Sequence, residues 1–342
     1  EGYLPVGRDF PVFLHPQTRE EYALARTERK TAPGYHGFTF HTDPGVTLQE
    51  DLARRDLTIN AMAVNAAHAD DPAHAPLFDP YHGLADLQAR VLRHVTDAFA
   101  EDPVRILRVA RFAARWPDFT VAPETRDLMR RMVAHGEVDH LVPERVWQEL
   151  SRGLMEQRPG RMFEVLHDCG ALARLLPELE GKRGSGEPDP DFSLPLRFAT
   201  LALALDDPAL LRQVCERWRV PNDCRELAEV VLREHAHIHA SADLDAAGVL
   251  RLLERCDAIR KPARFDDVLR VCEREARTHP GRPSPATPWL DRLRRALALA
   301  LSVDTAAVAA RAQADGLSGP RVGERILAAR IAAIDHGPGE SG

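Results

Sequence analysis

The sequence predicts an α+β fold, in which a small β-containing head precedes a long helical remainder. Short apolar runs at Val12–His15, Glu21–Arg26 and Gly37–His41, separated by Pro, Gly and charged residues, are typical of strands. From about Leu48 the apolar residues recur with a long helical period instead. The chain has 342 residues, which is more than one hydrophobic core usually serves, so about two domains are expected.

Helical periods continue to the end of the chain. Proline stands in the first turn of several of these segments, as at Pro103 and Pro143, where a missing backbone donor costs least. Two stretches of Gly, Pro and charge, Gly181–Asp191 and Gly281–Pro288, predict linkers. The predicted helices are Asp102–Arg115, Pro123–His135, Pro143–Gln157, Gly160–Cys169, Leu194–Leu205, Pro208–Arg217, Cys224–His235, Asp243–Cys256, Arg264–Thr278, Trp289–Ala300, Asp304–Asp315 and Gly319–Ile334.

The composition is that of an ordinary globular protein, with 44% hydrophobic and 28% charged residues. It excludes disordered and collagen-like chains, and no apolar run is long enough to predict a transmembrane helix. Five cysteines without a CxxC pair indicate a reducing, cytoplasmic compartment. The formal net charge of -7 does not exclude nucleic acid, because binding needs only a local basic patch.

A charged turn precedes an apolar run in LARRDLTINAMAVN, residues Leu52–Asn65. In one interpretation Arg54 and Arg55 hold phosphate while Asp56 and Asn60 brace the backbone. In the other, the same residues form a surface charge cluster that caps a helix. These residues alone leave both interpretations open.

Four arginines share one side of the predicted helix in FAEDPVRILRVARFAARW. At a turn of roughly 100° per residue, Arg105, Arg108, Arg111 and Arg115 lie within an arc of about 120°. Guanidinium groups in so apolar a helix require anionic or base-edge partners, and Asp102, one turn earlier, adds an acceptor. The alternative is a helix held by internal ion pairs.

Read together and in this order, RRDLTINAM, DPYHGLADLQARVLRH, EDPVRILRVARFAAR and PERVWQEL resemble the class II CCA-adding tRNA nucleotidyltransferases, from residue 1 to about Leu176. The superfamily also contains bacterial poly(A) polymerases. Its CCA-adding members add or repair the terminal C, C and A of tRNA from CTP and ATP without a nucleic-acid template. The resemblance implies a cytoplasmic enzyme with Mg²⁺ as cofactor, CTP and ATP as substrates, the tRNA 3′ end (acceptor stem) as partner and no membrane association.

The resemblance also implies a division of the chain into four parts. Residues 1–66 correspond to a truncated nucleotidyltransferase head, and residues 67–140 to a neck with the nucleotide-selecting helix. Residues 141–222 correspond to a helical body containing the linker 181–191, and residues 223–342 to a helical, tRNA-binding tail. The segment Phe78–His94 matches a springy element that lets the pocket change from CTP to ATP.

Site residues follow from the resemblance position by position. Asp102 and Arg105 match the EDxxR motif, which hydrogen-bonds the incoming base in place of a template. Glu21 matches a third acidic residue beside the family's catalytic pair. The implied nucleotide-binding set for ATP and CTP is Arg55, Asp56, Asn60, Asp102, Arg105, Arg108 and Arg111.

Two departures from the family pattern are large. The GGxVRD loop and the DxD pair that binds Mg²⁺ in the family are not in this chain. The Mg²⁺ ligands are therefore expected upstream of residue 1, and the chain is expected to be a fragment. Without these carboxylates it is expected to be inactive as given. The HD phosphohydrolase motif of multifunctional members is also missing, because Leu203 and Ala204 stand where its His and Asp would be. No phosphatase or cyclic phosphodiesterase activity is therefore expected.

Two other interpretations stay open. One is a poly(A) polymerase of the same superfamily, which selects ATP only. The other is a non-catalytic tRNA-binding protein, for which basic residues of the helical half would contact phosphate. Those residues, which are equally consistent with solvated helix faces, are Arg212, Arg217, Arg219, Arg260, Lys261 and Arg264.

Overall fold

The structure, a computed structural model, describes residues 2–6, 12–30, 38–41, 45–68, 74–182, 189–278 and 287–336. The chain divides into two units, Glu1–Glu180 and Gly181–Gly342, and each is described by itself. The boundary falls at the start of the predicted linker Gly181–Asp191. Most of that linker and of the predicted linker Gly281–Pro288 lies outside the described residues.

Antiparallel pairs of short strands open the first unit. The predicted strands at Val12–His15, Glu21–Arg26 and Gly37–His41 are confirmed in shortened form, and the strands β1 (Leu4–Val6) and β4 (Thr27–Lys30) add to them. Sheet order β1-β2-β3 pairs Phe13 with Tyr22, and β4 pairs separately with β5. The strands are β1 (Leu4–Val6), β2 (Val12–Leu14), β3 (Glu21–Ala23), β4 (Thr27–Lys30) and β5 (Phe38–His41).

The long helical period expected from Leu48 is wrong for the segment that follows it. The helix α1 (Leu48–Ala53) has six residues and gives way to 3₁₀ turns. Its start is fixed by a capping box, in which the Thr47 hydroxyl accepts from the backbone N–H of Glu50 and the Glu50 carboxylate accepts from that of Thr47. It ends where the apolar period stops, at the charged turn that begins with Arg54.

Between α1 and the long helices the chain makes further short elements. These are β6 (Ala63–Val64), β7 (Leu77–Phe78), α2 (Gly83–Ala89), β8 (Val91–Leu92) and β9 (Thr120–Val121). Strand β6 pairs with β7 antiparallel and β8 with β9 in parallel.

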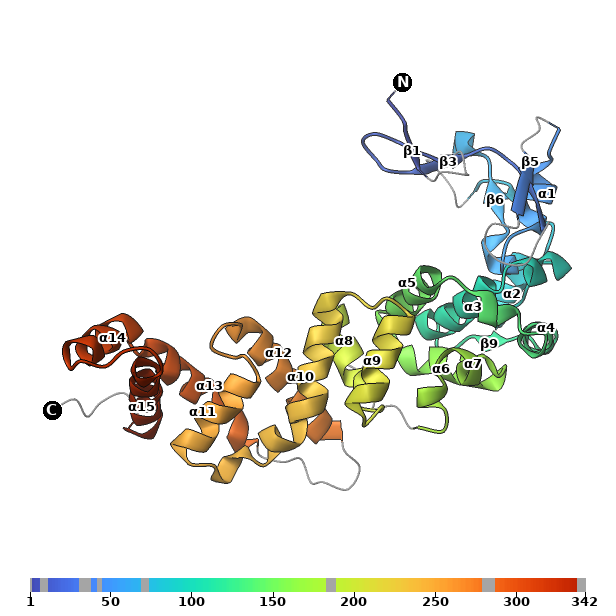
Figure 1. The fold of residues 1–342 in the computed structure, drawn as a ribbon. Helices are drawn as coiled ribbons and strands as arrows, with labels where there is room; N and C mark the ends of the chain where they lie inside the picture. The colour runs from blue at the N-terminus through green and yellow to red at the C-terminus, as the bar shows by residue number, and fades with distance from the viewer. Residues whose placement is uncertain are drawn as a thin grey trace. The chain divides into compact units, whose positions relative to one another are not determined.

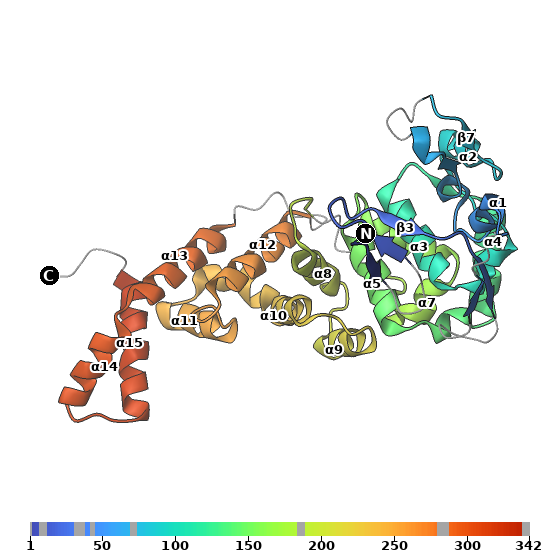
Figure 2. The ribbon, with the colours of Figure 1, turned by 90° about the horizontal axis from the view of Figure 1, so that it is seen from above.

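The core of the first unit surrounds α3 (Val104–Arg115). Ten of its 12 residues are buried, including two arginines. The helices α5 (Pro143–Leu154) and α6 (Pro159–Asp168) pack against it, with α4 (Pro123–Ala134) and α7 (Ala171–Leu175) nearby (Figures 1 and 2). The two buried arginines, Arg105 and Arg111, are largely shielded from water, so they must find partners inside the protein.

The second unit is helical throughout its described residues. Helix α10 (Asn222–His239) packs on α8 (Leu194–Ala202) and α12 (Pro262–Thr278) (Figures 1 and 2). Helices α14 (Thr305–Ala314) and α15 (Pro320–His336) lie side by side in the last described part of the chain. The helix predictions are confirmed within a few residues, and α10 continues to His239 rather than ending at His235. The helices are α8 (Leu194–Ala202), α9 (Pro208–Arg217), α10 (Asn222–His239), α11 (Ala246–Arg255), α12 (Pro262–Thr278), α13 (Pro288–Ser302), α14 (Thr305–Ala314) and α15 (Pro320–His336). Among the described residues, no helix is both long and apolar enough to cross a membrane.

Candidate functional site

Asp56 joins the charged turn after α1 to the arginine-bearing helix α3. Its Oδ2 accepts from Arg108 Nε at 2.7 Å, and its Oδ1 accepts from Asn60 Nδ2 and from the backbone N–H of Leu57. Burial alone would raise the pKa of Asp56, but the Arg108 charge and these hydrogen bonds hold that pKa below its usual value. Arg108 keeps a third of its side chain exposed, and its Nη1 lies 3.9 Å from Glu149 Oε1.

Arg111 lies one turn further along α3 and is held by α5. Its Nε donates to Glu149 Oε2 at 2.6 Å, and Nη1 lies 3.5 Å from Glu156. The guanidinium also lies 4.4 Å from the centre of the Phe112 ring. Arg111 and Glu149 are both buried. This arginine is therefore part of an internal ion pair, which is one of the interpretations that the sequence leaves open.

Arg105 is bonded to backbone rather than to Asp102. Its Nη1 donates to the carbonyl of Ala98 and its Nη2 to the carbonyl of Arg54, at 2.5 and 2.7 Å. The residue is buried at 7% exposure, so it fixes the loop between α1 and α3 in place.

Asp102 faces Arg145, the third residue of α5. The two form a bidentate pair, with Nη1 to Oδ1 at 3.1 Å and Nη2 to Oδ2 at 2.7 Å. Sequence reasoning placed Arg145 only at a helix start within PERVWQEL. The 43-residue separation explains this omission, because local spacing carries no information on such a pair.

Asp51 forms ion pairs with the other arginines of the charged turn. Arg54 and Arg55 both pair with its carboxylate, which also accepts the backbone N–H of Arg26. Burial opposes ionisation of Asp51, but these hydrogen bonds and charges lower its pKa. The side chain of Arg55 stays 46% exposed and can reach a solvent-borne anion.

Glu21 lies apart from this cluster in chain position and setting. It begins β3, pairs with Leu14 in the sheet register and is exposed. The described residues contain no group of three or more His, Cys, Asp and Glu side chains that could hold a metal ion. Asp51, Asp56, Asp102 and Glu149 each lie against arginines.

In the second unit, Arg260, Lys261 and Arg264, three of the basic residues considered for phosphate contact, form ion pairs. Lys261 and Arg264 share Glu226, at 2.6 and 2.9 Å, and Arg260 pairs with Asp257. A phosphate would have to compete with these carboxylates. The histidines of α10 contact separate carboxylates, His237 with Glu234 and His239 with Glu275.

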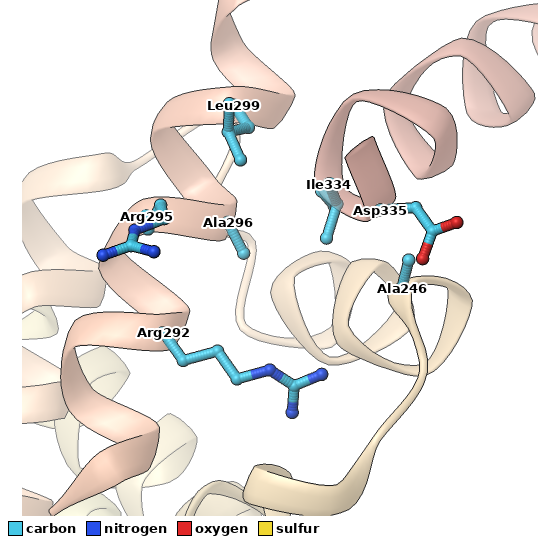
Figure 3. Close-up of a pocket in the computed structure, with 7 residues that line it drawn as sticks. All are labelled: Ala246, Arg292, Arg295, Ala296, Leu299, Ile334 and Asp335. Atoms are coloured by element: carbon cyan, nitrogen blue, oxygen red, sulfur yellow. The ribbon is translucent and has the colours of Figure 1, made fainter. Parts of the chain in front are cut away.

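A cavity of about 400 Å³ lies between α11, α13 and α15 (Figure 3). Leu299 and Ile334 give it apolar walls, and Arg295 and Asp335 add charge. The guanidinium of Arg292 donates to the backbone carbonyls of Ser241, Ala242 and Leu244, so this arginine closes the loop before α11.

Family models of the poly(A) polymerase type, which are nucleotidyltransferases, match the β-containing head and part of the helical region that follows it. Residues 10–93 match the family model of the poly A polymerase head domain. Residues 118–182 match the model described as the probable RNA and SrmB- binding site of polymerase A.

The chain belongs to the multifunctional CCA protein family. It is 58% identical to the multifunctional CCA protein of Acidovorax sp. (strain JS42), over 97% of this chain and 87% of that protein. It is 56% identical to that of Variovorax paradoxus (strain S110), over 99% of this chain and 91% of that protein.

Two solved structures share the fold at lower identity. The CCA-adding enzyme of Bacillus stearothermophilus in complex with CTP has a TM-score of 0.69 at 24% identity, and it covers 100% of this chain and 81% of its own. A CCA-adding enzyme in apo form II has a TM-score of 0.66 at 20% identity, covering 94% of this chain and 74% of its own.

Proposed function

We propose that the chain is a CCA tRNA nucleotidyltransferase that adds or repairs the 3′-terminal CCA of tRNA from CTP and ATP without a nucleic-acid template. The observation that carries this proposal is that a hydrogen-bond acceptor and cations lie at one site. Asp102 presents a partly exposed carboxylate at the start of α3, and Arg108 presents a partly exposed guanidinium from the same helix. The names of the relatives support the same activity.

The residues divide the work according to their exposure. Arg55 and Arg108 have partly exposed side chains that can meet the phosphates of CTP or ATP. Asp102 accepts a hydrogen bond from the base. Arg105, Arg111, Asp56 and Asn60 act through others, because their polar groups hold the loop after α1 and the helix α5 against α3.

The proposed RNA partner, the tRNA acceptor end, binds to the first unit. The match of residues 118–182 to an RNA-binding region of polymerase A supports binding of the tRNA acceptor end beside the nucleotide site. The five cysteines, all unpaired, support a reducing cytoplasmic location.

Nucleotidyl transfer in this family generally depends on a metal, and we propose Mg²⁺ as that metal. Asp51, Asp56, Asp102 and Glu149 do not fit the role, because each is held by arginines, and no cluster of three possible ligands lies together in the described ranges. We therefore assign no step to a metal ligand of this chain. We also propose that the chain as given does not extend tRNA, since it has neither GGxVRD nor a DxD pair in its head.

Extension of radiolabelled tRNA that lacks its 3′ CCA tests the function. The assay supplies Mg²⁺, CTP and ATP and compares this chain with the product of a coding region extended upstream. Incorporation of both C and A by the extended form supports a CCA-adding enzyme. Incorporation of A alone supports the poly(A) polymerase alternative, which the head-domain match keeps open. Binding of tRNA without extension by either form supports a non-catalytic tRNA-binding protein.

A further inference from the structure

We propose that Arg145 is a positioning residue that orients the Asp102 carboxylate and leaves it a single acceptor for the incoming base. This inference rests on the proposed function and deepens it. Arg145 lies at the start of α5 and Asp102 directly before α3, so the pair also joins two helix starts that are 43 residues apart.

The hydrogen bonds of Asp102 can be counted. Each carboxylate oxygen offers about two lone-pair sites. Oδ1 accepts from Arg145 Nη1 and from the backbone N–H of Val104, both at 3.1 Å, so both of its sites are filled. Oδ2 accepts from Arg145 Nη2 at 2.7 Å. Within the described part of the chain no other donor bonds this carboxylate, which leaves one acceptor site on Oδ2.

One acceptor in a fixed direction separates the four nucleotides into two pairs. Cytosine and adenine carry an exocyclic amino donor, whereas guanine and the uracil-type pyrimidine carry a carbonyl acceptor at that position. A carboxylate only accepts, so it attracts the amino group and repels the carbonyl oxygen. A carboxylate free to rotate would turn toward the ring N–H of uracil or guanine instead. The Arg145 fork removes that freedom, which makes Asp102 selective.

The planar fork is essential to this role. A guanidinium holds both carboxylate oxygens at once, whereas a lysine ammonium is a point charge that fixes neither. Asp102 is 19% exposed and Arg145 is 29% exposed, so the pair borders solvent and a base can approach it. Exposure also means that the change Arg145→Lys keeps the positive charge without opening a closed cavity.

The first unit offers a matched control. Arg174 forms a similar two-point pair with Asp139, on α7 and the 3₁₀ turn after α4, and that pair is exposed. The variant Arg174→Lys therefore removes the same kind of fork at a position outside the proposed nucleotide site.

Equilibrium dialysis with each of CTP, ATP, UTP and GTP tests the inference on the full chain. Compared with the unsubstituted protein, Arg145→Lys is expected to lower both ratios Kd(UTP)/Kd(CTP) and Kd(GTP)/Kd(ATP) by about tenfold, the effect of one hydrogen bond to a charged group. Arg174→Lys is expected to leave both ratios unchanged. If Arg145→Lys does not fold, as judged by its urea unfolding curve, Arg145→Gln is measured in its place with the same expectation.

The outcomes separate the two proposals. A protein that prefers CTP and ATP, and keeps the same preference after Arg145→Lys or Arg145→Gln, overturns the role of Arg145 and leaves the proposed function standing. A protein that shows no preference before any substitution overturns the nucleotide site of the proposed function, and the inference with it. A loss of preference in both Arg145→Lys and Arg174→Lys assigns the effect to general loosening and also overturns the role of Arg145.

Discussion

Arg105 donates from Nη2 to the backbone carbonyl of Arg54 at 2.7 Å and so ties the first turn of α3 to the end of α1. A second bond from Nη1 reaches the carbonyl of Ala98. Replacing Arg105 by Met leaves both carbonyls without this donor, and we expect a loss of about 2–3 kcal/mol in the free energy of unfolding. Urea unfolding measures this loss. The exposed Arg115 of the same helix is the control, and Arg115→Met is expected to change the free energy by less than about 0.5 kcal/mol.

The buried Asp56 makes stability depend on acid pH. Its pKa is lowered in the folded protein by Arg108 and its hydrogen bonds, against the opposing effect of burial. The unfolded chain therefore binds the proton more readily, so the stabilisation is present above about pH 3.9 and is lost as the pH falls through the lower, folded pKa. We expect Asp56→Asn to be less stable near neutrality and to lose less stability on acidification. Urea midpoints between pH 3 and 7 measure both, and parallel curves would contradict the prediction.

Glu149 balances the buried charge of Arg111. The change Glu149→Gln removes the nearer of the two carboxylates beside the buried Arg111 and leaves only Glu156, at 3.5 Å from Nη1. We expect a loss of about 3 kcal/mol, because breaking a buried ion pair leaves its charge poorly compensated. Glu164 pairs with Arg161 on the surface, so Glu164→Gln is expected to cost about 1 kcal/mol or less. Chemical unfolding of the two variants checks the difference, and equal losses would show that Arg111 is solvated.

Gly83 permits a close approach between α2 and the turn at Thr58. A Cβ at this position would lie 2.2 Å from the Thr58 carbonyl oxygen, which is backbone and cannot turn aside. At Gly153 the corresponding contact is with the Met162 sulfur, which belongs to a flexible side chain. We expect Gly83→Ala to destabilise the protein by about 2–3 kcal/mol and Gly153→Ala by less. Thermal unfolding gives the order, and the reverse order would contradict the packing described here.

The thiols are expected to be unreactive in the folded protein. All five cysteines are buried. Burial raises the pKa of Cys169 to about 11 and those of Cys215, Cys224 and Cys256 to about 12. Because the thiolate is the reactive form, Ellman's reagent at pH 8 should release almost no colour until urea unfolds the chain, when all five react. Rapid reaction of one thiol before unfolding would identify a locally open segment.

Sequence reasoning predicts regular elements here better than it predicts partners. Apolar periodicity and prolines such as Pro143 predict the long helices, because both signals are local. The turn residues Asp79-Pro80 and Gly83, followed by Asp86 and Arg90 at i, i+4 spacing, predict a junction from turn to helix, and α2 confirms it. The arginine arc on α3 is correct as geometry. It cannot show that Arg105 bonds backbone carbonyls, because those bonds depend on which segments the fold brings beside α3.

In the candidate site, too, the sequence predicts which residues take part better than it predicts which residues they contact. The motifs bring attention to Asp56, Asp102 and Arg108, which do lie at the start of α3 or against it. Local spacing pairs Asp102 with Arg105, three residues on, whereas the structure pairs it with Arg145. The sequence does not single out Asp51, because an aspartate in a charged run has no distinguishing pattern. Its role becomes visible only when Arg26 approaches from the preceding segment.

The cations among the proposed nucleotide-binding residues, Arg55, Arg105, Arg108 and Arg111, are all arginines, and this has a practical consequence for chemical labelling. The chain has 45 basic residues, of which only Lys30, Lys182 and Lys261 are lysines. Lys182 donates to the Leu205 carbonyl and Lys261 pairs with Glu226, both in the second unit. Amine-directed fluorophores or surface coupling would therefore attach at these lysines and the terminal amine, leaving the guanidinium groups of those arginines chemically unaltered.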